Sequence, residues 1–230
     1  MAEIAQIQSI RALAIRATLL DDCGRPVNTT TTNKTQISTD GFISISFSPD
    51  IEEGNKVRKP LGNGKLCVID DGVCPQLVGM DVTLTLCAVP PHILELLTGA
   101  AQLVDANGNV KGVVASSYSG TTCPPHVMIE VWTDNVGKRC DETGRACRYN
   151  RYILPETFNW IISGDISLEN DVYDLELKGY ATTNDYFQSP LGAADPDLTP
   201  GNVEALRTGP WGVICSNTLP EIISDNWVNP

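Results

Sequence analysis

The 230-residue chain has few of the residues from which catalytic and metal sites are built. It contains only two histidines, His92 and His126. It has no G-x-S-x-G nucleophile motif, no H-E-x-x-H metal motif and no phosphate-binding P-loop. Cys123 and His126 could form a dyad, but a loop or core role for both is the simpler interpretation. The sequence therefore predicts no enzyme, no cofactor and no metal site.

Long hydrophobic runs are also missing. No uncharged apolar stretch approaches the ~18 residues that a membrane-spanning helix needs. The first twenty residues do not have the pattern of a signal peptide, because Glu3 stands where a basic region is expected and Arg11 and Arg16 interrupt the apolar run. We expect no membrane span, and synthesis in the cytoplasm of the cell that makes the chain.

Basic residues are scarce, and the fraction of charged residues is low. The chain has 16 bases against 28 acids, a formal net charge of -12, and only 19% charged residues. An acidic surface repels nucleic acid and anionic membranes, so the charge argues against a conventional DNA-binding protein. The low charged fraction suggests a surface partly covered by other copies, although a rigid β-protein rich in Ser and Thr would have a similar composition.

The chain has eight cysteines, an even number that is unusual in a reducing cytosol. Cys140 and Cys147 are separated by six residues, more than the two to four that a zinc-binding hairpin requires. A turn at 141–144 would bring these two cysteines within disulfide range. We expect thiols in freshly made protein and predict Cys140–Cys147 as the first disulfide if one forms.

Most of the chain alternates apolar and polar residues with a period of two, which is typical of strands with one face on a core. The alternating runs are Arg11–Leu19, Gly41–Ser48, Asp81–Cys87, Val127–Trp132 and Val172–Tyr180. One short helix is predicted over Pro90–Gly99, which has prolines at its start and glycine at its end. The expected fold is mainly β, with one short helix.

Three segments depart from this pattern. Residues 51–65 form a long charged loop, and residues 138–150 form a hairpin between cysteines. Residues 184–230 contain six of the fifteen prolines and are predicted to form an extended arm outside a β-domain of residues 1–183. The arm keeps large apolar residues that a disordered tail would lack. It is expected to lie on its own subunit or on a neighbouring copy, with Trp211 and Trp227 as its anchors.

Nine of the sixteen bases fall in or directly beside the two loops, against an otherwise acidic chain. In the first loop, acids are followed closely by bases: Glu52, Glu53, Lys56, Arg58 and Lys59. Such loops can pair with the acidic body of another copy. Solvated loops whose charges have no partner are an equally good interpretation of the pattern.

Three stretches resemble the major tail tube proteins of long-tailed, siphovirus-type bacteriophages, particularly those of phages that infect actinobacteria. They are Gly41–Val57, Gly79–Ala100 and Ile162–Phe187, and together they cover under half of the chain. The cysteine hairpin is not part of the family pattern.

The resemblance implies two packed antiparallel sheets with a short flanking helix, in a virion protein assembled in the host cytoplasm. Hexameric rings would stack into a tube, with the loop of Glu52 to Lys59 contacting the next ring. The partners would be a tape measure protein, a tail terminator and baseplate or tip proteins. Double-stranded DNA would pass through the lumen without specific binding. The candidates for strand faces away from the core, some facing the channel and others the exterior, are Ser44, Ser46, Thr83, Thr85, Asp174 and Glu176.

Two other functions fit the same sequence. The cysteines, the Thr-rich strands and the low pI also suit a secreted or cell-surface β-sandwich that binds a carbohydrate or acts as an adhesin. Another ring-forming protein with the tube fold, such as a tail terminator or an injection-system tube, is the third possibility.

Overall fold

The computed structural model describes most of the chain. The described residues are 9–27, 35–53, 57–60, 63, 66–70, 74–87, 90–114, 123–135, 147–164, 174–192 and 195–222, with the backbone alone for 9–10, 57–60 and 66–70.

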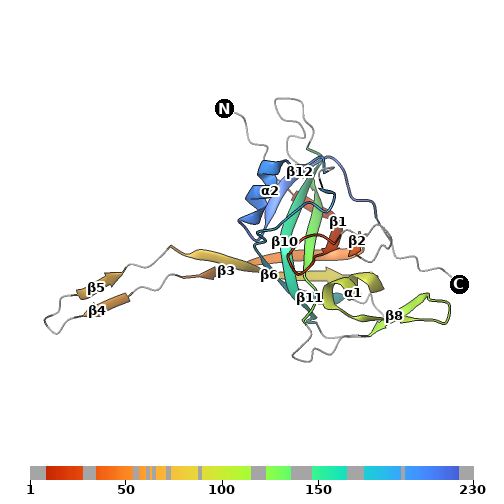
Figure 1. Ribbon diagram of the computed structural model, residues 1–230, viewed down its shortest axis with the longest axis horizontal. Helices are drawn as coiled ribbons and strands as arrows, with labels where there is room; N and C mark the ends of the chain where they lie inside the picture. The colour runs from red at the N-terminus through yellow and green to blue at the C-terminus, as the bar shows by residue number, and fades with distance from the viewer. Residues whose placement is uncertain are drawn as a thin grey trace.

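Two antiparallel layers make up the body of the protein (Figure 1). The first layer contains β1 (Ser9–Leu19), β2 (Gln36–Thr39), β9 (Val127–Asn135), β12 (Gly212–Ser216) and the first half of β10 (Tyr149–Ile162). The second contains β3 (Phe42–Glu52), β6 (Gln76–Leu86), β11 (Leu175–Thr182) and the second half of β10. The predicted fold class is confirmed.

Strand β10 belongs to both layers. Its residues 149–154 pair with β9, whereas residues 156–162 pair with β11. The register shifts between Leu154 and Thr157 and again between Phe158 and Ile161, and Asn159 has a positive φ of 56°. Such bulges bend a strand and increase its twist. The two layers are therefore one continuous eight-stranded sheet, folded over at β10.

The main core lies between the layers. In β6 the buried side chains are Val82, Leu84 and Leu86, which alternate with exposed or half-buried neighbours. Helix α1 (Pro91–Thr98) closes one end of this core with four buried aliphatic side chains. Proline stands in its first turn, and Gly99 ends it with a left-handed φ of 67°. The predicted helix is confirmed.

Two strands differ from simple alternation. In β3 a register shift between Phe42 and Ser44 makes Ile43 an extra residue, and its side chain is exposed rather than packed on the core. In β9 both faces are buried, so the prediction that one face of this strand stays uncovered is wrong. The C-terminal part of the chain covers the second face.

This C-terminal part contains regular structure that the sequence did not indicate. Residues 184–192 and 195–216, which we call the C-terminal strap, include β12 and a second helix, α2 (Pro200–Arg207). Thr199 caps that helix by accepting a hydrogen bond from the Asn202 N–H at 3.3 Å. The strap packs on its own chain, where it forms a second core on the outer face of the first layer. This core contains Leu20, Met128, Ile153, Phe187 and Leu206.

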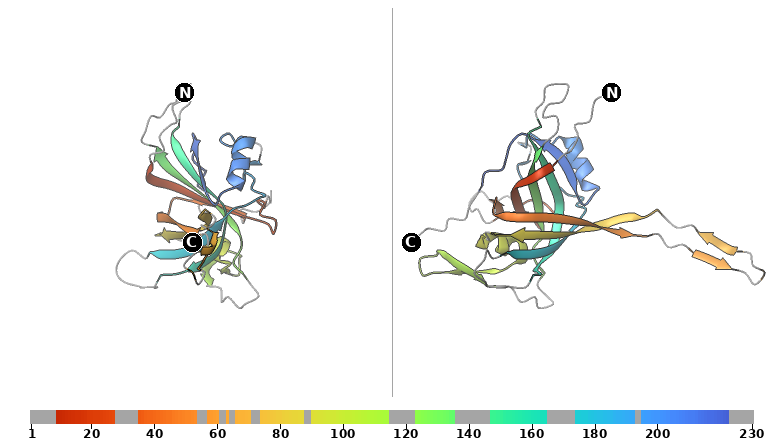
Figure 2. Two further views of the ribbon diagram at one scale, coloured as in Figure 1. Left: turned by 90° about the vertical axis from the view of Figure 1, so that its left-hand side faces the viewer. Right: turned by 180° about the vertical axis from the view of Figure 1, so that it is seen from behind.

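Two hairpins extend from opposite ends of the body (Figures 1 and 2). The far ends of β3 and β6, followed by β4 (Val57–Pro60) and β5 (Leu66–Asp70), form a long projecting ribbon. The other hairpin joins β7 (Ala101–Val104) to β8 (Val110–Val114). Its turn contains Asn107–Gly108, a pair of residues typical of tight hairpin turns, with Gly108 at a φ of 83°.

Candidate functional site: assembly surfaces and a clasped C-terminal strap

The outer face of the second layer is polar and open to solvent. Its register places three rows of side chains across β3, β6 and β11: Ser44–Thr85–Glu176, Ser46–Thr83–Lys178 and Ser48–Asp81–Tyr180. All of these side chains are exposed or half-buried. Five of the six residues predicted to lie outside the core share this face, and the sixth, Asp174, is exposed just before β11.

Carboxylates outnumber bases on this face. The Tyr180 hydroxyl donates a hydrogen bond to Asp50 at 2.9 Å and so connects β11 to β3 across β6. Glu176 accepts a hydrogen bond from the Ser163 hydroxyl at 2.8 Å. That hydrogen bond, together with Lys178, lowers the pKa of Glu176 below its ordinary value. The described part of the face therefore carries a net negative charge at neutral pH.

Strand β3 forms one edge of the eight-stranded sheet. It has eleven residues, and no strand pairs with its outer side within the described ranges. The opposite edge, β2, has four residues, of which Ile37, Ser38 and Thr39 are buried. A long exposed edge strand is a template for pairing with another chain. The two edges of the sheet are therefore not equivalent, and β3 is the one available to a partner.

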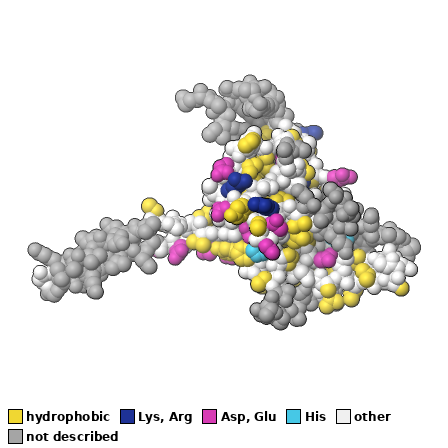
Figure 3. All heavy atoms as spheres, viewed as in Figure 1, with side chains coloured by type: hydrophobic (Ala, Val, Ile, Leu, Met, Phe, Trp, Pro, Cys, Tyr) yellow, Lys and Arg dark blue, Asp and Glu magenta, His cyan; other side chains and the backbone are white. Residues whose placement is uncertain are grey.

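The ribbon carries apolar residues where it leaves the body. Ile51, Leu77 and Val78 are exposed, and Ile51 lies opposite Leu77 across the two strands. On the face shown in Figure 3, hydrophobic and acidic side chains lie together along the described base of the ribbon. At the other end of the molecule the β7–β8 hairpin exposes Leu103 and Val104. Exposed apolar groups therefore lie at both ends of the molecule, and patches of such groups are typical of binding surfaces.

The predicted stacking residues lie on this ribbon where they are described. Glu52 is the last residue of β3, and Glu53 follows it and is exposed. Arg58 and Lys59 belong to β4, of which only the backbone is described, and Lys56 lies outside the described residues. The segment 51–65, predicted as a loop, thus contains the end of β3 and the whole of β4, which pairs with β5 just beyond the segment.

Beneath the strap lies a cluster of buried charges that the sequence analysis missed. Glu130 on β9 is fully buried between two arginines, Arg16 on β1 and Arg151 on β10. The Nε of Arg16 donates to Glu130 at 2.5 Å, and the Nε of Arg151 donates at 2.8 Å. Both guanidinium groups also lie over the ring of Trp132, at 5.0 and 5.3 Å from its centroid.

Arg151 connects this cluster to the strap. Its two terminal nitrogens donate to the two carboxylate oxygens of Asp195, at 3.1 and 2.9 Å. Asp195 also accepts a hydrogen bond from the Ser189 hydroxyl at 2.6 Å and one from the Asp197 N–H at 3.0 Å. A two-pronged Arg–carboxylate pair is among the stronger and more directional contacts in proteins.

Arginine charges fix the ionisation of both buried carboxylates. Burial alone raises the pKa of Glu130, but the charges of Arg16 and Arg151 and their hydrogen bonds outweigh it, so that pKa lies below its ordinary value. Burial likewise raises the pKa of Asp195, and hydrogen bonds from Arg151 and Ser189 lower it overall. Both groups are anionic at neutral pH, and the charge of Arg151 is stabilised in turn.

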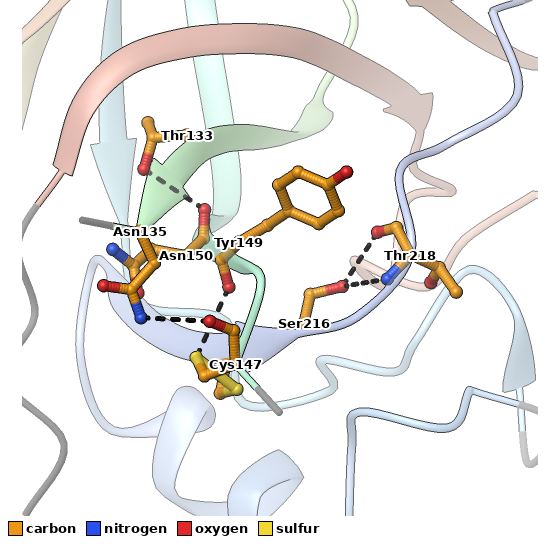
Figure 4. The surroundings of a disulfide bond; sticks show 8 residues. Thr133, Asn135, Cys147, Tyr149, Asn150, Ser216 and Thr218 are labelled. Carbon is orange, nitrogen blue, oxygen red and sulfur yellow. Dashed lines mark hydrogen bonds between the residues drawn. A yellow bond between two sulfur atoms is a disulfide. The ribbon is translucent and has the colours of Figure 1, made fainter. Parts of the chain in front are cut away.

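A disulfide joins the end of the strap to the start of β10 (Figure 4). It links Cys147 to Cys215, with Cα atoms 5.4 Å apart. The predicted Cys140–Cys147 pairing is therefore wrong for Cys147, and Cys140 lies outside the described residues. Cys147 pairs with Cys215 because the β10–β12 ladder places Cys215 opposite Asn150, and so brings the sulfur of Cys215 beside that of Cys147.

Of the two predicted anchor tryptophans, Trp211 lies on the body of its own chain. Its ring stacks on Tyr152 of β10, with centroids 6.5 Å apart, and its side chain is 42% exposed. Trp227 lies outside the described residues. The proposed role of Trp211 at a contact between copies remains a prediction.

His126 contacts a carboxylate and an aromatic ring. Its Nδ1 lies 2.5 Å from Glu156, and its ring stacks on Phe158 with centroids 5.2 Å apart. Both His126 and Cys123 line an open surface pocket of about 440 Å³.

Within the described residues, no group of three or more His, Cys, Asp or Glu side chains is placed to hold a metal ion. Nor does any described helix have the length and apolar character needed to cross a membrane.

Asn184 attaches the start of the strap to the body. Its Nδ2 donates to the Gly24 carbonyl at 2.7 Å and to the Pro155 carbonyl at 3.3 Å, and its Oδ1 accepts from the Tyr186 N–H. The side chain thus holds together a turn near the N-terminus, the bend of β10 and the strap.

Replacing Asn184 by aspartate is expected to destabilise the fold by about 2 kcal/mol, because a buried carboxylate faces two carbonyl oxygens in place of a donor. Asn202→Asp is the matched control, since Asn202 is exposed in the first turn of α2, where a negative charge is tolerated. Urea unfolding midpoints of both variants measure the difference. Equal midpoints would show that Asn184 is not an attachment point.

Comparison with known proteins identifies no relative: no protein-family model and no curated protein matches the chain.

Proposed function

We propose that the chain is a structural subunit of a bacteriophage tail tube, which assembles as hexameric rings that stack around a channel for the genome. The observation that carries the proposal is the exposed β3 edge and its continuation into the projecting ribbon. A two-stranded ribbon on its own is marginally stable in water, so a ribbon of this length suits a protein whose neighbours cover it. The resemblance of Gly41–Val57 to tail tube proteins falls on the same element.

Ring formation uses contacts between different surfaces of successive copies. The β3 edge of one subunit pairs with its neighbour, which removes the unpaired edge that a monomer has to tolerate. Such head-to-tail contacts close into a ring when the rotation between subunits allows it. The ribbon then reaches the next ring. There its acidic and basic side chains, and the apolar residues where it leaves the body, contact a further copy. Tape measure, terminator and tip proteins complete the tail.

The polar outer face of the second layer suits the channel wall. It combines the hydroxyl groups of Ser44, Ser46 and Thr83 with carboxylates. A surface of this kind neutralises few phosphates, so DNA gains little affinity from counterion release and can slide. A gel shift with duplex DNA at moderate salt tests this: we expect no shift, and a salt-dependent shift contradicts the assignment of this face.

Assembly itself is the first test of the proposal. Size-exclusion chromatography at several concentrations, followed by negative-stain microscopy, distinguishes rings and tubes from monomers. We expect rings or tubes at high concentration or with an initiator complex. A strictly monomeric protein in every preparation argues against a tube subunit.

Reversing the charge of Lys56, Arg58 and Lys59 to glutamate is expected to leave the fold intact and to shorten or abolish tubes, because the reversed loop repels the acidic body of the next ring. Arg11→Glu is the control, since Arg11 is an exposed base on the body, outside the ribbon. Circular dichroism checks the fold, and microscopy measures tube length. Tubes of normal length from the triple variant refute the stacking role.

The disulfide favours a second candidate function. Cys147–Cys215 is the kind of bond found in proteins exposed to an oxidising medium, as a secreted or cell-surface β-sandwich binding module is. Such a module remains a monomer and binds a carbohydrate or a surface protein. The microscopy experiment separates the two functions, and a glycan-array signal from a monomeric species supports the second.

A further inference from the structure

Several contacts hold the C-terminal strap on the body, and one of them, the disulfide, is covalent. The others include the hydrogen bonds of Asn184 at its start, the Arg151–Asp195 pair, the stack of Trp211 on Tyr152 and the β10–β12 ladder. Of these contacts, only the disulfide is made and broken by oxidation and reduction.

The two sulfur atoms differ in access. Cys147 is buried, at 6% exposure, whereas Cys215 is exposed on β12. A thiol in solution therefore reaches Cys215 first. Cys147 is the leaving group of that attack. Its backbone carbonyl accepts a hydrogen bond from the side chain of Asn135 at 3.3 Å, which holds the residue beside β10 (Figure 4).

We propose that Cys147–Cys215 is a reversible redox clasp that controls how firmly the C-terminal strap is held. A low-molecular-weight thiolate attacks the Cys215 sulfur, forms a mixed disulfide there and releases Cys147 as a thiolate, which takes up a proton. A second thiol then attacks the mixed disulfide and frees Cys215. In sum, two small thiols become one disulfide, and the protein gains two electrons and two protons as two cysteine thiols.

Closure runs in the opposite direction with a small-molecule disulfide as the oxidant. The β10–β12 ladder positions the two thiols before they are oxidised, because Tyr149–Ile153 pairs with Gly212–Ser216 without a register shift. A chain made with thiols in the cytosol thus carries a strap held by noncovalent contacts. The same chain in an oxidising medium carries one that is covalently closed.

Opening the strap has two consequences for the surface. It uncovers the apolar side chains of Met128 and Ile153, which are fully buried beneath it. It also frees the edge of β10 that β12 occupies. Both are surfaces on which another chain can bind, so the clasp determines whether they are available. The proposal does not depend on tube formation and applies to either candidate function.

Limited trypsin proteolysis of the full-length chain tests the clasp. The protein is prepared once with glutathione disulfide and once with dithiothreitol. The rate of cleavage after Arg207, in the strap, is compared with that after Lys111, on the exposed β8, as an internal reference. Cleavage follows the population of the open strap when opening is fast. We expect reduction to raise the relative rate at Arg207 about tenfold or more, because the covalent restraint is lost.

Three variants make the test specific. A double variant, Cys147→Ser and Cys215→Ser, should be cut at the fast rate in both media, and Cys23→Ser, which removes an exposed free cysteine, should respond like the wild type. The single variant Cys147→Ser should also be cut fast and should show a mixed disulfide at Cys215 by mass spectrometry in glutathione disulfide. Equal wild-type rates in the two media, or a redox response that persists in the double variant, overturn the proposal.

Discussion

Replacing Glu130 by glutamine is expected to lower the free energy of unfolding by about 3–5 kcal/mol, the range seen when one partner of a buried ion pair is removed. The substitution changes shape very little, so the loss comes from charge. It leaves Arg16 and Arg151, which are 5% and 1% exposed, without the carboxylate that both contact. Urea unfolding, followed by tryptophan fluorescence, measures the effect.

The control for this prediction lies on the same strand. Asp134 pairs with Arg11 at 3.6 Å, but Arg11 is exposed and Asp134 is only half-buried, so Asp134→Asn should cost less than about 1 kcal/mol. If Glu130→Gln behaves like Asp134→Asn, the two buried arginines do not depend on this carboxylate and the cluster contributes little to stability.

The same cluster predicts how stability varies with pH. The pKa values of Glu130 and Asp195 are lower in the folded chain than their ordinary values of about 4.3 and 3.9 in an unfolded chain. Their contribution to stability is therefore fully present above those ordinary values and is lost as the pH falls through the lower folded-state values. Unfolding midpoints should fall on acidification below about pH 4, and less steeply in Glu130→Gln, which lacks one of the two titrating groups.

Gly179→Ala is the second substitution with a large expected effect, about 3 kcal/mol of destabilisation. A methyl group at this position would lie 2.5 Å from a ring carbon of Trp160 and within 2.9 Å of two others. Trp160 is fully buried, and its Nε1 donates to the Thr157 hydroxyl at 2.9 Å. Because the ring is held in this way, the clash has to be relieved by separating β10 from β11.

Gly201→Ala provides the opposite case. Gly201 lies in α2, and no atom is within 4 Å of the added methyl group. Alanine favours the helix over glycine, so this variant should be more stable by about 0.5–1 kcal/mol. Thermal unfolding of both variants against the parent chain tests the pair. A Gly179→Ala variant as stable as the parent would falsify the close packing of Trp160 on this backbone.

The strands and helix α1 could be predicted because their signals are local. In β6 alternation alone identifies Val82, Leu84 and Leu86 as core residues, and the structure buries all three. The helix follows from proline at its start and glycine at its end. Helix α2 has a similar local signal in Thr199–Pro200, which the proline-rich composition around it obscured.

The buried cluster and the disulfide depend instead on residues far apart in the sequence. Glu130 stands between Ile129 and Val131, so alternation places it on the solvent side of its strand. What covers that side is the strap, which begins more than fifty residues later. The partner of Cys147 is fixed by the β10–β12 register across a sequence separation of 68. No local pattern carries either fact.

The order in which the strands pair has a consequence for how the chain is made. The first strand, β1, pairs with β2 on one side and with β9 on the other, and β9 is still untranslated when the ribosome has produced half of the protein. The bonds from Asn184 to Gly24, and then the β12 ladder, form only when nearly the whole chain has emerged. Strands β3 and β6, by contrast, are close in sequence and can pair early. A ribosome-bound intermediate therefore presents the adhesive ribbon before the rest of the sheet exists. On polysomes, where nascent copies are crowded together, an exposed strand edge of this kind is open to premature association.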